Sequence, residues 1–179
     1  RAVGRDHPDY YACHLLSHIL GGGMASRLFQ EVRERRGLAY SVYTFLDTWR
    51  ETGLFGVYSS TGPERGRELI QTICTELQRM AASGPTRAEL QRAKRQLRAS
   101  LLMGLEACGA VCEDLARQLL FFGRWLPLAE RLARIEAVTA TDVERVAQQI
   151  LLGSPPTLAI VGPLKGLPDY ETVQRWLCG

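Results

Sequence analysis

Two neighbouring runs of alternating side chains, residues 38–48 and 52–62, constrain the fold of this chain more than any other feature. In LAYSVYTFLDT and TGLFGVYSSTG, apolar and polar residues alternate, and β-branched and aromatic residues are frequent. Both properties are typical of half-buried strands, because the side chains of an extended backbone point to opposite faces in turn. The polar segment DTWRE between the runs predicts a turn, so we expect an antiparallel hairpin.

Helical spacing dominates on both sides of this hairpin. Apolar residues recur every three or four positions, which is the period of an amphipathic helix. The expected helices span residues 6–22, 24–37, 63–84, 86–109, 110–123, 126–138, 139–151 and 167–177. Residues suited to N-capping stand at the start of three of these helices: Asp6 or Asp9, Thr86 with Glu89, and Thr139 or Thr141.

A third apolar run, PPTLAIVGPL at residues 155–164, is bounded by prolines and predicts a late strand. Two early strands and one late strand, with helices between them, favour an α+β fold over alternating βα units. We therefore predict a single domain over residues 1–179, in which an antiparallel sheet packs against helices in two layers. Three strands make a thin sheet, so a further strand is expected, either before Arg1 or from elsewhere.

Charge and cysteine content argue against several classes of function. The net charge is only +3, and we interpret the arginine-rich segments as solvated helix faces rather than as a nucleic-acid surface. Five cysteines without a C-x-x-C pair argue against a disulfide framework and a zinc ribbon, and Cys108 and Cys112, one helical turn apart, are expected in the core.

Localisation is only weakly constrained by the sequence. No apolar run approaches the ~20 residues of a membrane span, and no signal peptide is visible. The cysteine usage favours a reducing compartment. We expect the bacterial cytoplasm, with the periplasm or an organelle as open alternatives.

The glycine run Gly21-Gly22-Gly23 is not a nucleotide-binding loop. Such a loop follows a strand and opens a helix, whereas this run follows a predicted helix. A P-loop also needs a lysine followed by serine or threonine, and GGGMAS contains no lysine. From the residues alone the run is a helix stop with a tight turn.

The segment HLLSH places His14 and His18 one helical turn apart, so both imidazoles could face one metal ion. A zinc peptidase also needs a glutamate between the histidines, in H-E-x-x-H or H-x-x-E-H. Leu15 and Ser17 occupy those two positions. We therefore interpret both histidines as structural and predict no metal ligands in this chain.

Arg33 and Tyr40 lie on either side of a turn at Gly37, one near the end of the second helix and one near the start of the first long strand. A guanidinium can hold a peptide carbonyl or a carboxylate, and a phenol can donate one hydrogen bond without being charged. Two interpretations stay open from these residues alone: a substrate-binding pair, or a surface arginine beside a half-buried tyrosine.

The block LGGGMASRLFQEVRERRGLAYSVYTF, followed by ETGLFGVYSSTGP, resembles the C-terminal half of M16-type zinc metallopeptidases, the group of mitochondrial processing peptidase, pitrilysin and insulin-degrading enzyme. RAELQRAKRQLRASLLMGLE, RQLLFFGR, IEAVTATDVERVAQQIL and LAIVGPL follow in the family's order, so the resemblance covers about residues 6–163. The chain is most similar to the short bacterial processing-peptidase-like branch. The resemblance implies the metal-free half of a LuxS/MPP-like metallohydrolase.

In that family the N-terminal half binds zinc through H-x-x-E-H and a distant glutamate, and the second half closes over the substrate. The second half contributes an R-x6-Y pair, which Arg33 and Tyr40 match. The resemblance implies that Arg33 helps to hold the substrate and the interface between halves. It implies that Tyr40 donates its hydroxyl to the scissile carbonyl as that carbon becomes tetrahedral, and that the short loop Gly21-Gly22-Gly23 lines the cleft.

The resemblance also implies a partner. The helix carrying His14 and His18 corresponds to the zinc helix of the other half, but with Ser17 in place of the catalytic base. Zn²⁺ is therefore expected in an N-terminal zinc-binding half, in the same longer chain or in a separate subunit of a homo- or heterodimer. This chain alone should not hydrolyse peptides. The alternative is a catalytically inactive scaffold of the same fold, like the core subunits of a respiratory complex.

Overall fold

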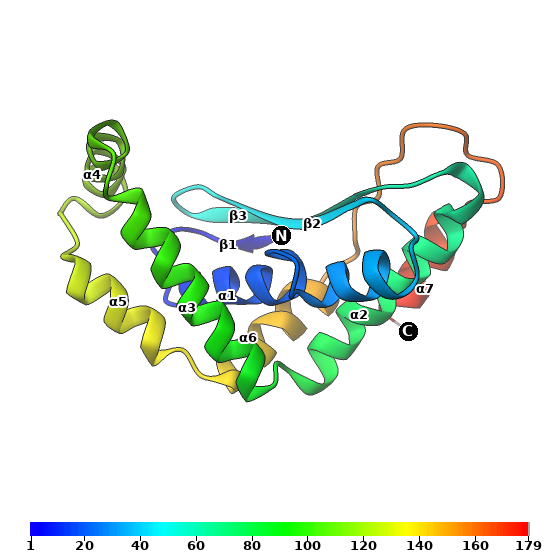
Figure 1. The fold of residues 1–179 in the computed structure, drawn as a ribbon, viewed down its shortest axis with the longest axis horizontal. Helices are drawn as coiled ribbons and strands as arrows, with labels where there is room; N and C mark the ends of the chain where they lie inside the picture. Colours follow the sequence, from blue (N-terminus) through cyan, green and yellow to red (C-terminus); the bar gives the residue numbers. More distant parts are fainter. Residues whose placement is uncertain (179) are drawn as a thin grey trace.

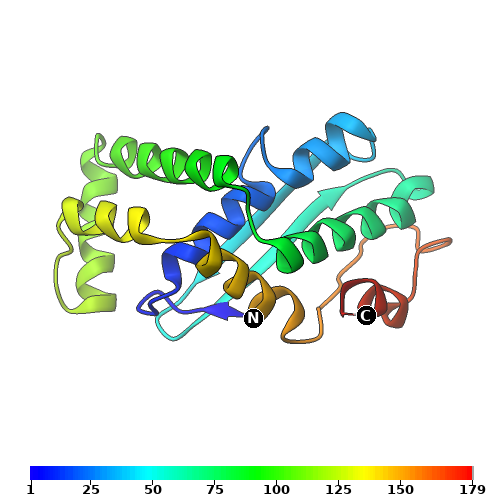
Figure 2. The same ribbon diagram turned by 90° about the horizontal axis from the view of Figure 1, so that it is seen from below.

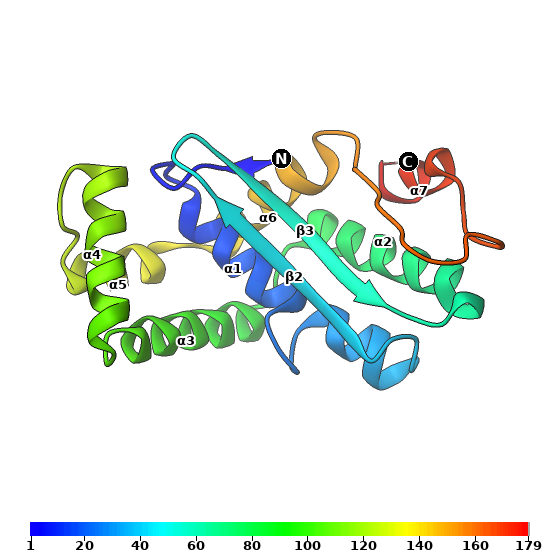
Figure 3. The same cartoon turned by 90° about the horizontal axis from the view of Figure 1, so that it is seen from above.

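The computed structural model describes residues 1–178 and has two layers (Figure 1). One layer is an antiparallel sheet in the order β1-β3-β2, formed by β1 (Ala2–Val3), β2 (Ser41–Thr48) and β3 (Thr52–Ser60). Helices cover one face of the sheet (Figure 2), whereas no helix of residues 1–178 covers the other face (Figure 3). The predicted α+β class, with a sheet packed on helices, is confirmed.

The predicted hairpin forms between β2 and β3, with Tyr43 opposite Tyr58 and Phe45 opposite Gly56. Val42 of β2 is buried beneath the sheet, whereas the rings of Tyr43 and Tyr58 stack with centroids 5.0 Å apart. A Cβ on Gly56 would stand only 2.1 Å from Cζ of Phe45, because that ring lies over the glycine. The face of the sheet that lacks helices therefore carries a strip of aromatic rings.

The helix α1 (Tyr10–Gly21) is central to the second layer. It contacts β2 on one side and α3, α5 and α6 on others, so its leucines at 15, 16 and 20 are fully buried. The other helices are α2 (Gly66–Ser83), α3 (Arg87–Gly104), α4 (Cys108–Phe122), α5 (Leu128–Ala137), α6 (Ala140–Ala147) and α7 (Tyr170–Cys178), with a 3₁₀ turn at Pro63–Arg65. One hydrophobic cluster runs from Ala2 to Leu177. The single domain over 1–179 stays a prediction.

Half of the second predicted helix is a π-helix, η1 (Phe29–Arg35). A second π-helical segment, η3 (Gln148–Leu152), continues α6. A π-helix bonds each N–H to the carbonyl five residues back rather than four. Apolar spacing does not distinguish these two patterns over two turns, so the sequence predicted only a helix.

Gly21 lies where α1 passes beneath β2. A Cβ at this position would stand 2.4 Å from the backbone nitrogen of Thr44 and 2.7 Å from its Oγ1. We expect Gly21→Ala to lower the free energy of unfolding by about 1–2 kcal/mol, because overpacking against backbone outweighs the gain in helix propensity. Urea-induced unfolding measures this change. Gly104→Ala is the control, since a Cβ there meets nothing within 4 Å; equal losses in both variants would contradict the prediction.

The predicted cap by Thr86 is confirmed, and of the two alternatives Thr139 and Thr141 the cap is Thr139. Thr86 and Thr139 each accept a hydrogen bond from the backbone N–H three residues later, and each forms a full capping box. The predicted cap by Asp6 or Asp9 is wrong. Asp9 occupies the N-cap position of α1 without capping it, because its carboxylate accepts two hydrogen bonds from Arg145 of α6, at 2.6 and 2.8 Å. This ion pair lowers the pKa of Asp9.

The predicted strand at residues 155–164 is wrong for the described part of the chain. The segment has no regular secondary structure and pairs with no strand, and Val161 is fully exposed. A strand exists only where a neighbouring edge supplies hydrogen-bond partners. On the outer edge of β3, only Thr52 and Gly53 are paired, with β1. The composition of residues 155–164 does not show whether these residues will reach such an edge.

The predicted core positions of Cys108 and Cys112 are also wrong, because both thiols are exposed on α4. This helix projects from the end of the molecule (Figure 1), and within residues 1–178 its contacts are sparse. One of its few anchors is Asp114, which accepts a hydrogen bond of 2.6 Å from Arg131 of α5. No described helix is both long and apolar enough to cross a membrane.

Candidate functional site

The turn after η1 places Arg33 and Tyr40 at one point. Gly37 has φ +59°, a backbone conformation that favours glycine, and its N–H donates to the Arg33 carbonyl at 3.1 Å. Leu38 and Ala39 are buried directly after it, so they anchor the chain as it enters the sheet. Tyr40 is the last residue before β2.

Arg33 lies between two aromatic rings. Its Cζ is 4.5 Å from the ring centroid of Tyr40 and 4.8 Å from that of Phe29, one turn earlier in η1. Both distances are within the range of cation–π contacts. Such a stack fixes the guanidinium without using its N–H donors. Oε1 of Glu34 is 3.8 Å from Nε, which is beyond hydrogen-bond distance.

Tyr40 is 81% exposed even though its ring contacts Arg33. No group among residues 1–178 forms a hydrogen bond with its hydroxyl or with the Arg33 guanidinium within accepted distances. The pair therefore offers several N–H donors and one O–H donor from a fixed position. This arrangement is chemically suited to hold a peptide carbonyl or carboxylate and to stabilise a developing oxyanion.

The glycine run is divided between a helix and a loop. Gly21 is the buried last residue of α1, Gly22 caps the helix with its N–H donating to the His18 carbonyl, and Gly23 is exposed with φ +131°. The predicted helix stop is confirmed, although only Gly23 needs a positive φ. This loop precedes η1, whereas Arg33 and Tyr40 lie at the other end of η1, so the structure does not bring the two groups together.

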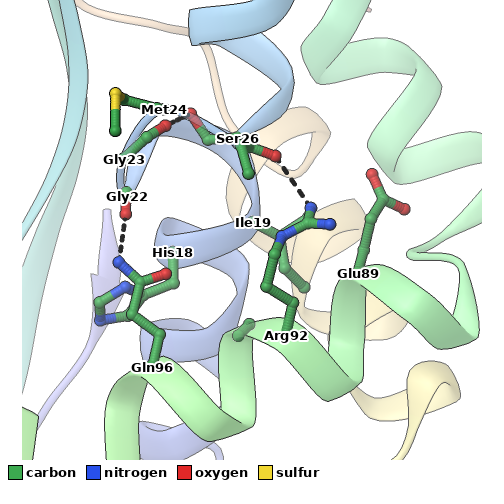
Figure 4. A pocket seen from close by; sticks show the side chains of 11 residues that line it. His18, Ile19, Gly22, Gly23, Met24, Ser26, Glu89, Arg92 and Gln96 are labelled. Carbon is green, nitrogen blue, oxygen red and sulfur yellow. Dashed lines mark hydrogen bonds between the residues drawn. The ribbon is translucent and has the colours of Figure 1, made fainter. Parts of the chain in front are cut away.

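A hollow of about 230 Å³ lies beside the loop (Figure 4). It is lined by His18 and the loop on one side and by Arg92 and Gln96 of α3 on the other. Gln96 Nε2 donates to the Gly22 carbonyl at 2.6 Å, and the Arg92 guanidinium donates to the Ala25 carbonyl at 2.9 Å.

His14 and His18 do not fit a zinc site. Within residues 1–178 no group of three or more histidine, cysteine, aspartate or glutamate side chains could hold a metal ion. Ser17, at the position of a catalytic base, instead donates to Oγ1 of Thr44 at 3.0 Å. Burial raises the pKa of the nearby Cys13 thiol to about 12, which disfavours the thiolate that binds metals.

The two imidazoles are held neutral inside the fold. Burial lowers the pKa of His14 to about 4, with a smaller contribution from His18, and burial also lowers the pKa of His18. Nε2 of His14 and Nδ1 of His18 are buried without a hydrogen-bond partner. The lowered pKa values agree with neutral, structural histidines.

Sequence reasoning missed Phe29, Arg92 and Gln96. Aromatic residues four positions before an arginine on a helix are one signal that could have indicated the stack with Arg33. Arg92 and Gln96 bond backbone carbonyls, which every residue carries, so no sequence pattern indicates them.

Comparison with known proteins identifies the family of this chain. The family described as "Peptidase M16 inactive domain" matches residues 1–97, which is more than half of the chain. The chain belongs to the M16 peptidase family. It is 43% identical over 163 residues to an uncharacterized zinc protease of Streptomyces coelicolor, covering 91% of this chain and 35% of that protein. It is 35% identical to the beta subunit of the mitochondrial-processing peptidase of Dictyostelium discoideum, covering 98% and 39%.

Solved structures of similar fold agree with this assignment. The chain superposes on a peptidase M16 inactive domain from Pseudomonas fluorescens with a TM-score of 0.71 and 30% identity, covering 83% of this chain and 35% of that one. It superposes on a chain of complex III₂ from Candida albicans with a TM-score of 0.87 over 99% of this chain and 45% of that one. At 22% identity this second likeness shows the fold alone.

The predicted family and branch are confirmed: the chain is an inactive-type M16 domain, related to zinc proteases and to a processing-peptidase beta subunit. It spans between a third and two fifths of the length of the M16 relatives named above. The roles assigned to Arg33, Tyr40 and the three glycines stay predictions.

Proposed function

We propose that this chain is the metal-free half of an M16 zinc metallopeptidase, which closes the substrate cleft over a zinc-binding half. The family assignment supports a non-catalytic M16 domain. Zinc in the other half would supply the activated water. The residues of this chain would bind the peptide and stabilise the charge that develops on its carbonyl oxygen.

The stack of Phe29, Arg33 and Tyr40 is the observation that carries this proposal. Arg33 would hold a peptide carbonyl or a carboxylate, because its donors are unclaimed and its position is set by two rings. Tyr40 would donate its exposed hydroxyl to the oxyanion. A scaffold needs neither an exposed phenol nor an arginine without a hydrogen-bond partner.

The cleft wall would be formed by the face of the sheet that lacks helices, together with the loop Gly22–Ala25. Tyr43 and Tyr58 stack on this face, and Phe45 covers Gly56 beside them. An aromatic surface of this kind suits apolar side chains of a peptide. The wall begins next to Tyr40, since β2 starts at the following residue.

Reconstitution tests the proposed function. We expect this chain alone to leave a quenched fluorescent peptide intact, and a mixture with a zinc-binding M16 half to hydrolyse it. A metal chelator should abolish that hydrolysis. Arg33→Ala should raise KM, whereas Arg98→Ala, an exposed arginine of α3, serves as the control. Binding without hydrolysis would favour the scaffold alternative, and full hydrolysis by the zinc half alone would remove this chain from the reaction.

A further inference from the structure

The loop after α1 is held by α3. Gln96 donates to the carbonyl of Gly22, and Arg92, one helical turn earlier, donates to the carbonyl of Ala25 (Figure 4). The two donors thus hold both ends of the loop Gly22–Ala25. Their spacing on α3 sets the separation of those ends, because a helix is a rigid support.

The two middle carbonyls of the loop are occupied as well. Ser26 Oγ donates to the Gly23 carbonyl at 2.6 Å, and Gln30 Nε2 donates to the Met24 carbonyl at 2.8 Å. Four consecutive carbonyl oxygens, from Gly22 to Ala25, therefore each accept a side-chain hydrogen bond. A glycine-containing loop is ordinarily mobile, because glycine loses much backbone entropy on ordering. Here the four side-chain hydrogen bonds offset the entropic cost of ordering the loop.

The helix that holds the loop is itself fixed to the segment that follows the loop. Arg27 donates to both carboxylate oxygens of Glu89 in the first turn of α3, at 2.7 and 2.9 Å. Arg27, together with backbone and hydroxyl donors of Thr86, overcomes the effect of burial and lowers the pKa of Glu89 to about 2. Lys94 of α3 is buried and donates to the carbonyl of Glu136 in α5, which fixes α3 to a second element. The position of α3 therefore determines the position of the loop.

We propose that Arg92 and Gln96 are positioning residues, which hold the loop Gly22–Ala25 in one conformation and present Met24 to the peptide. Met24 is 75% exposed at the tip of this loop, and a flexible thioether suits varied apolar side chains. This inference rests on the proposed function, because it assumes that the loop lines the substrate cleft. It adds that the loop acts as a rigid wall whose place is set by α3.

Two matched pairs of variants test this role. Gln96→Ala and Arg92→Ala each remove one hydrogen bond to the loop. Gln91→Ala and Arg95→Ala remove exposed side chains of the same types from the same helix. The first readout is the heteronuclear ¹H–¹⁵N NOE of the Gly23, Met24 and Ala25 amides in the 179-residue chain. We expect NOE values typical of a mobile loop in Gln96→Ala and Arg92→Ala, and wild-type values in the two controls. The thermal midpoints of unfolding of these variants should be lowered by no more than about 4 °C.

The second readout is peptide hydrolysis by the chain assembled with a zinc-binding half. We expect Gln96→Ala, which removes a neutral donor, to raise KM about fivefold, and Arg92→Ala, which removes a cationic donor, to raise KM by at least as much. The kcat should stay within about twofold, because the loop contacts substrate away from the scissile bond. Arg92→Lys keeps a cationic donor and should restore KM.

The two readouts separate the possible failures. Unchanged NOE values in both loop variants would overturn the positioning role. A mobile loop with unchanged KM would overturn the contact between loop and substrate. A wild-type assembly that hydrolyses no peptide would overturn the proposed function, whereas the NOE comparison would still decide whether Arg92 and Gln96 hold the loop.

Discussion

Replacing Tyr40 by phenylalanine is expected to lower kcat of the assembled peptidase by about ten- to a thousand-fold, in line with the loss of one oxyanion donor. The substitution removes only the hydroxyl. The ring that stacks on Arg33 at 4.5 Å stays, so the fold and the position of the guanidinium should be unchanged. KM should change little, because the hydrogen bond is made chiefly in the transition state. Steady-state kinetics on a fluorogenic peptide measures both constants.

Tyr43→Phe is the matched control for this experiment. Tyr43 is also exposed and lies three residues further on, but its ring stacks on Tyr58 rather than on the arginine. We expect it to leave kcat within about twofold of wild type. An unchanged kcat in Tyr40→Phe would remove Tyr40 from the chemistry. Equal losses in both variants would show that the effect comes from the aromatic wall as a whole.

The hairpin and the helices could be predicted because their sequences repeat with the period of their backbone. The two threonine caps could be predicted because a cap is local, requiring only a hydroxyl and an acid three residues apart. The strand at residues 155–164 could not, because a strand also needs an edge elsewhere in the fold. Asp9 shows the same limit, since its carboxylate bonds Arg145, 136 residues away, instead of the adjacent helix end.

The residues of the candidate site likewise fall into those that the sequence indicated and those that it could not indicate. The spacing of Arg33 and Tyr40 across Gly37 indicated that both could reach one point, and the structure places the guanidinium on the ring. Phe29 completes the stack through the turn of η1, whose π-helical form apolar spacing does not reveal. Arg92 and Gln96 were beyond sequence reasoning, because their acceptors are backbone carbonyls 67 and 74 residues away.

Acidification is expected to destabilise this chain through His14. The imidazole has a pKa of about 4 in the folded state against 6.5 as its ordinary value, chiefly because it is buried, with smaller contributions from His18 and Arg5. Below pH 6.5 the unfolded chain therefore binds a proton that the folded chain does not. Stability is fully present above pH 6.5 and falls as the pH drops toward 4. The loss from this group is about 2 kcal/mol at pH 5 and about 3 kcal/mol at pH 4.

The surroundings of His14 explain why a proton is excluded rather than accommodated. The ring packs edge-on against Tyr10, with centroids 4.5 Å apart, and Arg5 and Arg131 line the adjoining hollow with Gln118. No carboxylate lines this hollow among residues 1–178, and Arg131 is already paired with Asp114. An imidazolium there would therefore meet the positive charge of Arg5 without a carboxylate beside it. The buried Nε2 already lacks a hydrogen-bond partner.

Urea unfolding at pH 7.5 and pH 5 in wild type and His14→Leu measures the effect. Leucine has similar volume and no proton to bind, so the variant should lose about 2 kcal/mol less than wild type between the two pH values. His7→Gln, which removes an exposed imidazole outside the core, should keep the full wild-type loss. A His14→Leu variant that loses as much stability as wild type would assign the acid sensitivity to another group. In that case His18 is the next residue to substitute, because it lies one turn away on the same helix and because burial lowers its pKa as well.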